Sequence, residues 1–133
     1  MFSSLTDHWS TPKEVYDKLN AEFLFDFDPS PLFGGDSVHN NGLLADWGNS
    51  NYCNPPYSDI KHWIQKGYSE YLKGKTVVFL IPSRTDTRWW HDYVMKAHEI
   101  RFIKGRLKFG GQRTLLPSQA VLLFSNIRAM RNS

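Results

Sequence analysis

The strongest constraint on the fold is a run of apolar or β-branched residues, Thr76-Val77-Val78-Phe79-Leu80-Ile81. A strand with one face in solvent alternates apolar and polar residues, because successive side chains point to opposite faces. A strand that is apolar at nearly every position is typical of a sheet covered on both faces, which is the usual setting of parallel strands. The run therefore predicts a central parallel strand.

Shorter segments on both sides of this run predict the rest of the sheet and its helices. The expected strands cover residues 24–28, 51–54, 100–103 and 120–124, and the expected helices cover residues 12–20, 58–72 and 87–96. The first helix is expected to start at Ser10-Thr11-Pro12, because Ser or Thr caps helices and Pro is favoured at the first helical position. Strands that alternate with helices form βαβ units, so we expect an α/β fold with a parallel or mixed sheet.

Length and composition fit one intracellular domain. The chain has 133 residues, of which 41% are hydrophobic. Cys53 is the only cysteine, so no internal disulfide is possible and a reducing compartment is expected. The sequence has no run of about 18 apolar residues and no signal-peptide pattern at its start. We therefore expect a cytoplasmic protein without a membrane partner.

Basic residues are concentrated in the last third of the chain. The formal net charge is +3, and residues 101–131 contain seven Lys or Arg residues and no acidic residue. This segment predicts a phosphate-facing surface, although an ordinary solvated surface explains it equally well. The candidate phosphate contacts are Arg106 and Lys108, together with Arg84 and Arg88 near the end of the central strand.

The clearest functional motif is Asn54-Pro55-Pro56-Tyr57. An Asn carboxamide both donates and accepts hydrogen bonds, and two prolines hold their carbonyl groups on a rigid turn. Tyr adds a flat ring with a polar tip. Carbonyl oxygens can accept both hydrogens of a planar amine while the ring stacks on its face. The motif therefore predicts methyl transfer to an exocyclic amine such as N6 of adenine.

Two weaker motifs are expected beside this one, because ligands of open α/β sheets bind at the carboxyl ends of strands. Asp28-Pro29 ends a predicted strand, where an acid suits a ligand with an amine or ribose hydroxyls. Asp46-Trp47 follows a short apolar element, where the acid is expected to accept from an amine and the indole to cover a ring. Ordinary loops explain either motif about as well.

In this order, the motifs resemble those of amino-methyltransferases that use S-adenosylmethionine, most closely the phage-type (Dam-like) DNA N6-adenine methyltransferase family. The resemblance covers nearly the whole chain. Its other motifs are Trp9-Ser10-Thr11-Pro12, Ile81-Pro82-Ser83-Arg84-Thr85-Asp86-Thr87 and Gly105-Arg106-Leu107-Lys108-Phe109. It implies a compact, trimmed class I methyltransferase (Rossmann-like) sheet that is mostly parallel with helices on both faces. It also implies a single domain over residues 1–133, with no separate target-recognition domain.

The resemblance assigns roles to individual residues. It implies S-adenosylmethionine as the cofactor and DNA as the partner, in a bacterial host cell, with the gene carried by a phage or prophage. The implied cofactor contacts are Trp9, Thr11, Pro12, Asp28, Pro29, Asp46 and Trp47, and the implied catalytic residues are Asn54, Pro55, Pro56 and Tyr57. Arg84, Arg88, Arg106 and Lys108 are expected to contact DNA, and Phe109 is expected either to stack on a base or to pack in the core.

Other functions stay open from the sequence. The same motif also suits adenine in RNA or a glutamine amide in a protein, and the chain also fits a non-catalytic DNA-binding relic of the fold. A homodimer is a further possibility for a short chain that must grip DNA. The five histidines are scattered, so no metal site is expected. Ser58 and Ser83 lack the setting of a nucleophile elbow, which argues against a hydrolase.

Overall fold

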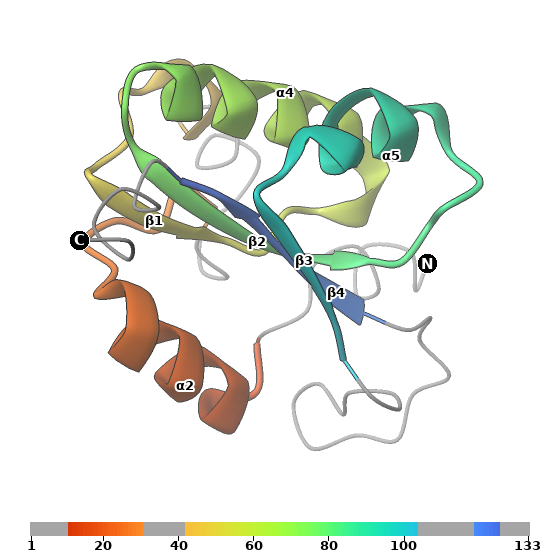
Figure 1. Cartoon of the computed structure of the whole chain (residues 1–133). Coiled ribbons are helices and arrows are strands. Elements are labelled where there is room, and N and C mark those ends of the chain that lie inside the picture. Colours follow the sequence, from red (N-terminus) through yellow and green to blue (C-terminus); the bar gives the residue numbers. More distant parts are fainter. Residues whose placement is uncertain (1–10, 31–41, 104–118, 126–133) are drawn as a thin grey trace, which may run out of the picture.

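Helices cover both faces of a four-stranded sheet (Figure 1). The computed structural model describes residues 11–30, 42–103 and 119–125. The elements are α2 (Lys13–Phe23), β1 (Ser50–Cys53), η1 (Tyr57–Asp59), α4 (Ile60–Leu72), β2 (Thr76–Pro82), α5 (Arg88–Tyr93), η2 (Val94–Lys96), β3 (Glu99–Phe102) and β4 (Gln119–Phe124). Helices α4 and α5 lie on one face of the sheet and α2 on the other. The predicted α/β class, with helices on both faces, is therefore confirmed.

The strand order is β1-β2-β4-β3, so the predicted central strand β2 does lie inside the sheet. Strand β1 pairs with β2 in parallel, whereas β4 runs antiparallel to both β2 and β3. Among the described strands the sheet is thus mixed, and the prediction of a mostly parallel sheet is not confirmed. All six residues of β4 are buried although the strand is antiparallel. An apolar run therefore indicates that both faces of a strand are covered, but it does not indicate whether the strand is parallel or antiparallel to its neighbours.

The chain between α2 and β1 differs in detail from the prediction. Helix α2 continues past Asn20 to Phe23 and ends at Leu24, which has a left-handed backbone with a φ of 52°. The predicted strand 24–28 is reduced to one parallel bridge between Phe27 and Asn51. Pro12 occupies the N-cap position of α2 without a side-chain cap, so Thr11 does not cap the helix as expected.

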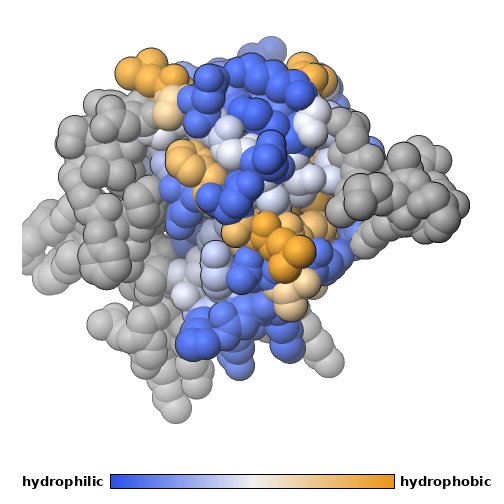
Figure 2. All heavy atoms as spheres, turned by 90° about the vertical axis from the view of Figure 1, so that its left-hand side faces the viewer, coloured by the Kyte–Doolittle hydropathy of each residue, from blue (hydrophilic) through white to orange (hydrophobic). Residues whose placement is uncertain are grey.

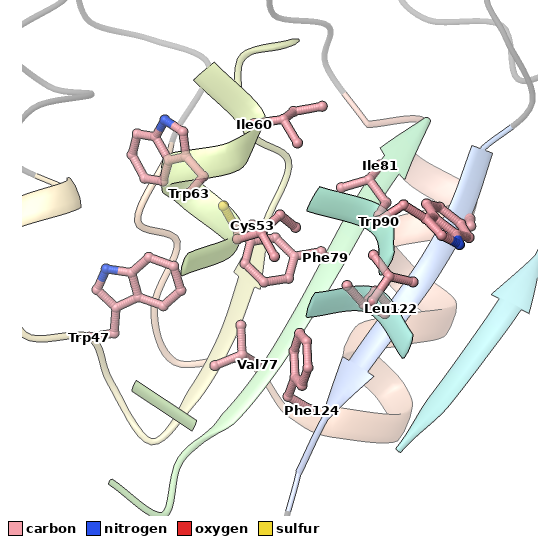
Figure 3. Close-up of a cluster of buried hydrophobic side chains, with 13 residues drawn as sticks. Trp47, Cys53, Ile60, Trp63, Val77, Phe79, Ile81, Trp90, Leu122 and Phe124 are labelled. Atoms are coloured by element: carbon pink, nitrogen blue, oxygen red, sulfur yellow. The ribbon is translucent and has the colours of Figure 1, made fainter. Parts of the chain in front are cut away.

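The core is divided by the sheet into two clusters of buried side chains. Alternate residues of β2 serve the two clusters, because successive side chains of a strand point to opposite faces. Val77, Phe79 and Ile81 pack towards α4 and α5, as Figure 3 shows, whereas Val78 and Leu80 pack towards α2. Each helical layer therefore rests on one set of alternating strand residues.

A glycine in α4 lets this helix approach the sheet closely. A Cβ atom on Gly67 would lie 2.3 Å from the Phe79 ring, whose residue is completely buried. In an exposed helix Gly→Ala stabilises by roughly 1 kcal/mol, but overpacking a core costs about 1–3 kcal/mol. The net of these two effects is an expected decrease of about 1 kcal/mol in the free energy of unfolding of Gly67→Ala, measured by urea denaturation. Ser69→Ala, at an exposed position of the same helix, is the matched control, and equal stability of the two variants would contradict this packing.

The far end of α4 is fixed by one buried carboxylate. The Glu70 side chain is fully buried and pairs with Lys66 (3.1 Å), Lys73 (2.9 Å) and Lys75. It also accepts the backbone N–H of Trp47 at 3.1 Å. Burial opposes the charged form, but these hydrogen bonds outweigh it and lower the pKa of Glu70 to about 2. Glu70 therefore ties α4 to the segments that precede β1 and β2.

Hydrophobic side chains on the surface are dispersed. The large exposed ones among the described residues are Leu24, Leu44, Leu72, Met95 and Phe102. On the face in Figure 2, the hydrophobic residues form small groups separated by hydrophilic ones. Among the described residues, no helix combines the length and apolar character that crossing a bilayer requires.

Candidate active site

Three neighbouring segments end at the same edge of the sheet. The bridge at Phe27 and strands β1 and β2 run in parallel, so the residues that follow them share this carboxyl edge. Antiparallel β4 begins at the same edge, where Gln119 pairs with Pro82. This edge therefore gathers the Asp28-Pro29-Ser30 turn, the Asn54–Tyr57 motif and Gln119, which is where open α/β sheets bind ligands.

Asn54 follows β1 directly and is 6% exposed. Its Nδ2 atom donates to Oγ1 of Thr11 at 3.3 Å, and the same Thr11 oxygen is hydrogen-bonded to the Tyr52 hydroxyl. Burial raises the pKa of Tyr52 far more than the Thr11 bond lowers it, so the phenol stays neutral. The structure thus joins Thr11 to the motif through side chains that lie 43 and 41 residues apart in the sequence.

The rest of the motif forms a rigid turn into η1. Pro55 and Pro56 are buried, and Pro56 has the extended backbone (φ −64°, ψ 135°) that precedes this helix. Tyr57 is half-buried, and its hydroxyl donates to Oε1 of Gln119 at 3.4 Å. Burial raises the pKa of Tyr57, and the bond to Gln119 partly offsets this. The phenol is therefore neutral, and Gln119 holds its hydroxyl.

Asp28 lies beside this turn in a loop of its own. The backbone N–H of Ser30 donates to its carboxylate at 3.0 Å. Partial desolvation raises the pKa of Asp28 to about 6, and the Ser30 N–H opposes that change. Burial is the main cause of the raised pKa values of Tyr16, Tyr52 and Cys53, and the nearby Asp28 carboxylate raises each of them further. Asp28 is therefore a negative charge at the edge that carries Asn54.

Two buried hydroxyl groups at this edge lack a partner among the described residues. They are Oγ of Ser30, in the Asp28 loop, and Oγ of Ser83, directly after β2. Buried polar atoms without a hydrogen bond are rare in native proteins, and a catalytic role or a bound water or ion commonly explains them. The donor set therefore fits a ligand with amine and hydroxyl groups. Within the described residues, no group of three or more His, Cys, Asp or Glu side chains is placed to hold a metal ion.

The raised pKa of Asp28 has a consequence for stability. The folded state holds this proton up to a pH of about 6, whereas the unfolded chain releases it near 3.8, so the group destabilises the fold as pH rises between these values. We expect Asp28→Asn to be more stable than the wild type at pH 7 by about 1 kcal/mol, a value reduced because the residue is exposed. The gain should vanish below pH 4 in thermal unfolding. A gain that is independent of pH would contradict this assignment.

Asp46 and Trp47 lie elsewhere, contrary to the expectation that they join the site. They precede the first residue of β1, so they lie near the amino edge of the sheet. The Asp46 carboxylate is 87% exposed and pairs with Lys73 at 3.3 Å. Trp47 is 4% exposed, donates its indole N–H to the Gly42 carbonyl and packs against Phe79. Asp46 therefore lies on the surface and Trp47 lies in the core. Both are at the edge of the sheet opposite to Asn54, because they precede β1 and Asn54 follows it.

The remaining predicted site residues fall into two groups. Arg84 follows β2 at the carboxyl edge and pairs with Asp86 at 3.5 Å, and Arg88 begins α5 with a side chain that is 90% exposed. Pro12 precedes α2 and accepts two backbone N–H groups through its carbonyl. Trp9, Arg106, Lys108 and Phe109 lie outside the described residues.

The structure adds site residues that the sequence did not single out. Tyr52 lies two residues before Asn54, so the alternation of a strand places both on the α2 face, and this signal was available from the sequence. Gln119 begins an apolar strand, and nothing in the sequence pairs it with Tyr57, which lies 62 residues away.

The carboxyl edge of this α/β sheet thus carries an Asn-Pro-Pro-Tyr turn and an acidic loop, groups whose chemistry suits a planar exocyclic amine. The family model for DNA N-6-adenine-methyltransferase (Dam) matches residues 1–122. The chain therefore belongs to this family, whose enzymes methylate the N6 amine of adenine in DNA.

Individual relatives agree with the family match. The chain is 33% identical over 120 residues to the DNA N-6-adenine-methyltransferase of Haemophilus phage HP1, an alignment that covers 81% of this chain and 69% of the relative. It is 26% identical over 113 residues to the DNA N-6-adenine-methyltransferase of Escherichia phage T1. That second alignment covers 78% of this chain and spans about half (48%) of the relative's length.

Proposed function

We propose that this chain transfers a methyl group from S-adenosylmethionine to N6 of adenine in DNA, and that the Asn54–Tyr57 turn holds the amine. The observation that carries this proposal is the placement of Asn54. Its carboxamide is buried at the carboxyl edge of the sheet and is oriented by a hydrogen bond to Thr11. An oriented amide at a ligand-binding edge is suited to fixing the geometry of an incoming amine.

On the adenine side, the motif acts by positioning and by fixed dipoles. Oδ1 of Asn54 and the carbonyl of Pro55 accept the two N6 hydrogens, which localises the nitrogen lone pair that is otherwise delocalised into the ring. Tyr57 stacks on the base, and Gln119 holds its hydroxyl. The carbonyl dipoles stabilise the positive charge that develops on nitrogen. N6 becomes acidic once it is methylated, so its proton leaves without a strong base.

The adenine must leave the duplex to reach this turn. Extruding a base costs a few kcal/mol of lost pairing and stacking. Arg84 and Arg88 are exposed on the segments that follow β2, where they contact phosphates and offset part of this cost. Arg106 and Lys108 are proposed to contact phosphates because they lie in the basic last third of the chain, and Phe109 is proposed to stack on the base as in related enzymes. The protein acts on DNA inside the host cell.

On the cofactor side, S-adenosylmethionine supplies a methyl group bound to a positively charged sulfur. Asp28 and Pro29 are proposed to hold it, because they follow the bridge that pairs Phe27 with β1, and because the neighbouring Ser30 hydroxyl has no hydrogen-bond partner among the described residues. Trp9 and Pro12 are proposed to complete this side. Asp46 and Trp47 are not included, since they lie at the amino edge.

Methyl transfer is tested directly with labelled S-adenosylmethionine and unmethylated plasmid DNA, followed by digestion to nucleosides. We expect label in N6-methyladenine, and we expect unlabelled DNA to compete better than total RNA. If total RNA competes better than unlabelled DNA, the acceptor of the methyl group is RNA and not DNA.

The alternative of a non-catalytic DNA-binding relic has its own signature. A ligand at 100 times its dissociation constant stabilises a protein by about 2.7 kcal/mol. Absence of both methyl transfer and thermal stabilisation by S-adenosylmethionine would favour the relic. Stabilisation without transfer to DNA would direct the search to RNA and to protein glutamine amides.

A further inference from the structure

A chain of three hydroxyl and amide groups links the catalytic Asn54 to the hydrophobic core. Tyr52 packs on the α2 side of the sheet, and Asn54 follows it by two residues, just after the end of β1. Between them stands the Thr11 side chain, which belongs to the segment just before α2. Its Oγ1 atom accepts from Nδ2 of Asn54 at 3.3 Å and is also hydrogen-bonded to the Tyr52 hydroxyl.

The Tyr52 end of this chain is rigid. Tyr52 is 3% exposed. Its ring meets Tyr16 edge-on at 5.2 Å between centroids and Phe25 at 5.3 Å. Such aromatic contacts fix the plane of the ring, and the position of its hydroxyl follows. The hydroxyl in turn limits where Thr11 places its oxygen.

The Asn54 end determines which carboxamide atom faces which way. The two ends of the amide differ only in whether they donate or accept, and a rotation of 180° exchanges them. Thr11 Oγ1 takes the donor end, so the acceptor Oδ1 is directed away from it. A reversed amide would present N–H groups to the N–H groups of adenine and would repel the substrate.

We propose that Thr11 is a positioning residue that orients the Asn54 carboxamide for methyl transfer, with Tyr52 as its anchor in the core. This inference rests on the proposed function, because the oriented oxygen is the one that accepts from N6. It assigns to Thr11 a task different from the cofactor contact that the sequence resemblance implies.

Kinetics of four variants test the proposal. Thr11→Val keeps the shape of the side chain and removes the hydroxyl, and Tyr52→Phe removes the other hydroxyl. We expect each to lower kcat by about 10- to 100-fold. The KM for DNA and the Kd for S-adenosylmethionine should stay within about threefold of the wild type. Thr11→Ser should restore most of the rate, and Tyr16→Phe, which changes a neighbouring tyrosine outside the chain of bonds, should behave as the wild type.

A second measurement does not depend on activity. The side-chain amide signals of Asn54 in a 1H–15N NMR spectrum, assigned by their loss in Asn54→Ala, should shift in Thr11→Val and Tyr52→Phe and stay in place in Tyr16→Phe. Circular dichroism and Tm identify any variant that fails to fold. If one fails, the proposal is tested by the kcat of Thr11→Ser and by the Asn54 amide signals of the variants that do fold.

Each contrary outcome has a definite meaning. A higher Kd for S-adenosylmethionine in Thr11→Val with kcat unchanged would make Thr11 a cofactor contact and overturn the proposal. Wild-type kcat in Thr11→Val, or unshifted Asn54 signals, would also overturn it. A wild-type protein that transfers no methyl group to DNA counts against the proposed function, and the amide signals still test whether Thr11 orients Asn54.

Discussion

Asn54→Asp is expected to lower kcat for DNA methylation by about 10³-fold, in line with the loss of one well-placed polar group in an enzyme site. The change keeps oxygen acceptors but removes the N–H donor that Thr11 accepts. It also puts a carboxylate at a position that is 6% exposed, beside the Thr11 and Tyr52 oxygens. A charged group is costly at this buried position, so the acid favours a protonated or displaced state. Single-turnover kinetics with labelled cofactor measure the loss.

The control for this variant is the same substitution at the other edge of the sheet. Asn49 is exposed and precedes β1, so Asn49→Asp should leave kcat within about threefold of the wild type. Asn54→Ala should be as inactive as Asn54→Asp, and both should bind S-adenosylmethionine in calorimetry. Turnover of Asn54→Asp at the wild-type rate would refute the proposed role of this side chain.

Glu70→Ala is expected to destabilise the protein by about 3 kcal/mol, since removing one partner of a buried ion pair leaves the others uncompensated. The Glu70 carboxylate is fully buried, and Lys66 and Lys75 are only 17% and 18% exposed at their side chains. The variant also leaves the Trp47 N–H without its acceptor. Chemical denaturation at pH 7 measures the change in the free energy of unfolding.

The pH dependence of this effect follows from the low pKa of Glu70. A group whose folded pKa lies near 2 contributes its stability above its unfolded value of about 4.5, and this is lost as pH falls towards 2. The difference between the wild type and Glu70→Ala should therefore shrink between pH 5 and pH 2. Asp46→Asn, which breaks an exposed pair with Lys73, is the control and should change stability by less than about 0.5 kcal/mol. If the free energy of unfolding of Glu70→Ala falls by less than about 1 kcal/mol, water replaces Glu70 as the partner of the lysine ammonium groups.

Asp46→Asn also tests where the cofactor binds. If the site lies at the carboxyl edge, this variant binds S-adenosylmethionine as the wild type does. The sequence placed Asp46 at the end of a short element and inferred a ligand contact. Its distance from Asn54 depends on the direction in which the chain enters β1, and local sequence carries no signal for that direction.

Features that depend on neighbouring residues were predictable from the sequence. The apolar run at Thr76–Ile81 predicted the buried strand β2, because side-chain hydrophobicity determines burial. The Asn54–Tyr57 turn was predictable because proline fixes the backbone wherever it occurs. Four of the expected strands appear within one residue of their predicted bounds at both ends, and helix α4 starts two residues later than predicted.

Relations between distant segments required the folded chain. Strand β4 was located correctly, but its antiparallel direction depends on how the chain returns to the sheet. The bond from Asn54 to Thr11 and the bond from Tyr57 to Gln119 join residues 43 and 62 positions apart. The sequence specified which residues are buried and where the chain turns, since these depend on side-chain chemistry and local backbone geometry. The order and direction of the strands then determined which side chains meet at the carboxyl edge, because such contacts exist only once the sheet is assembled.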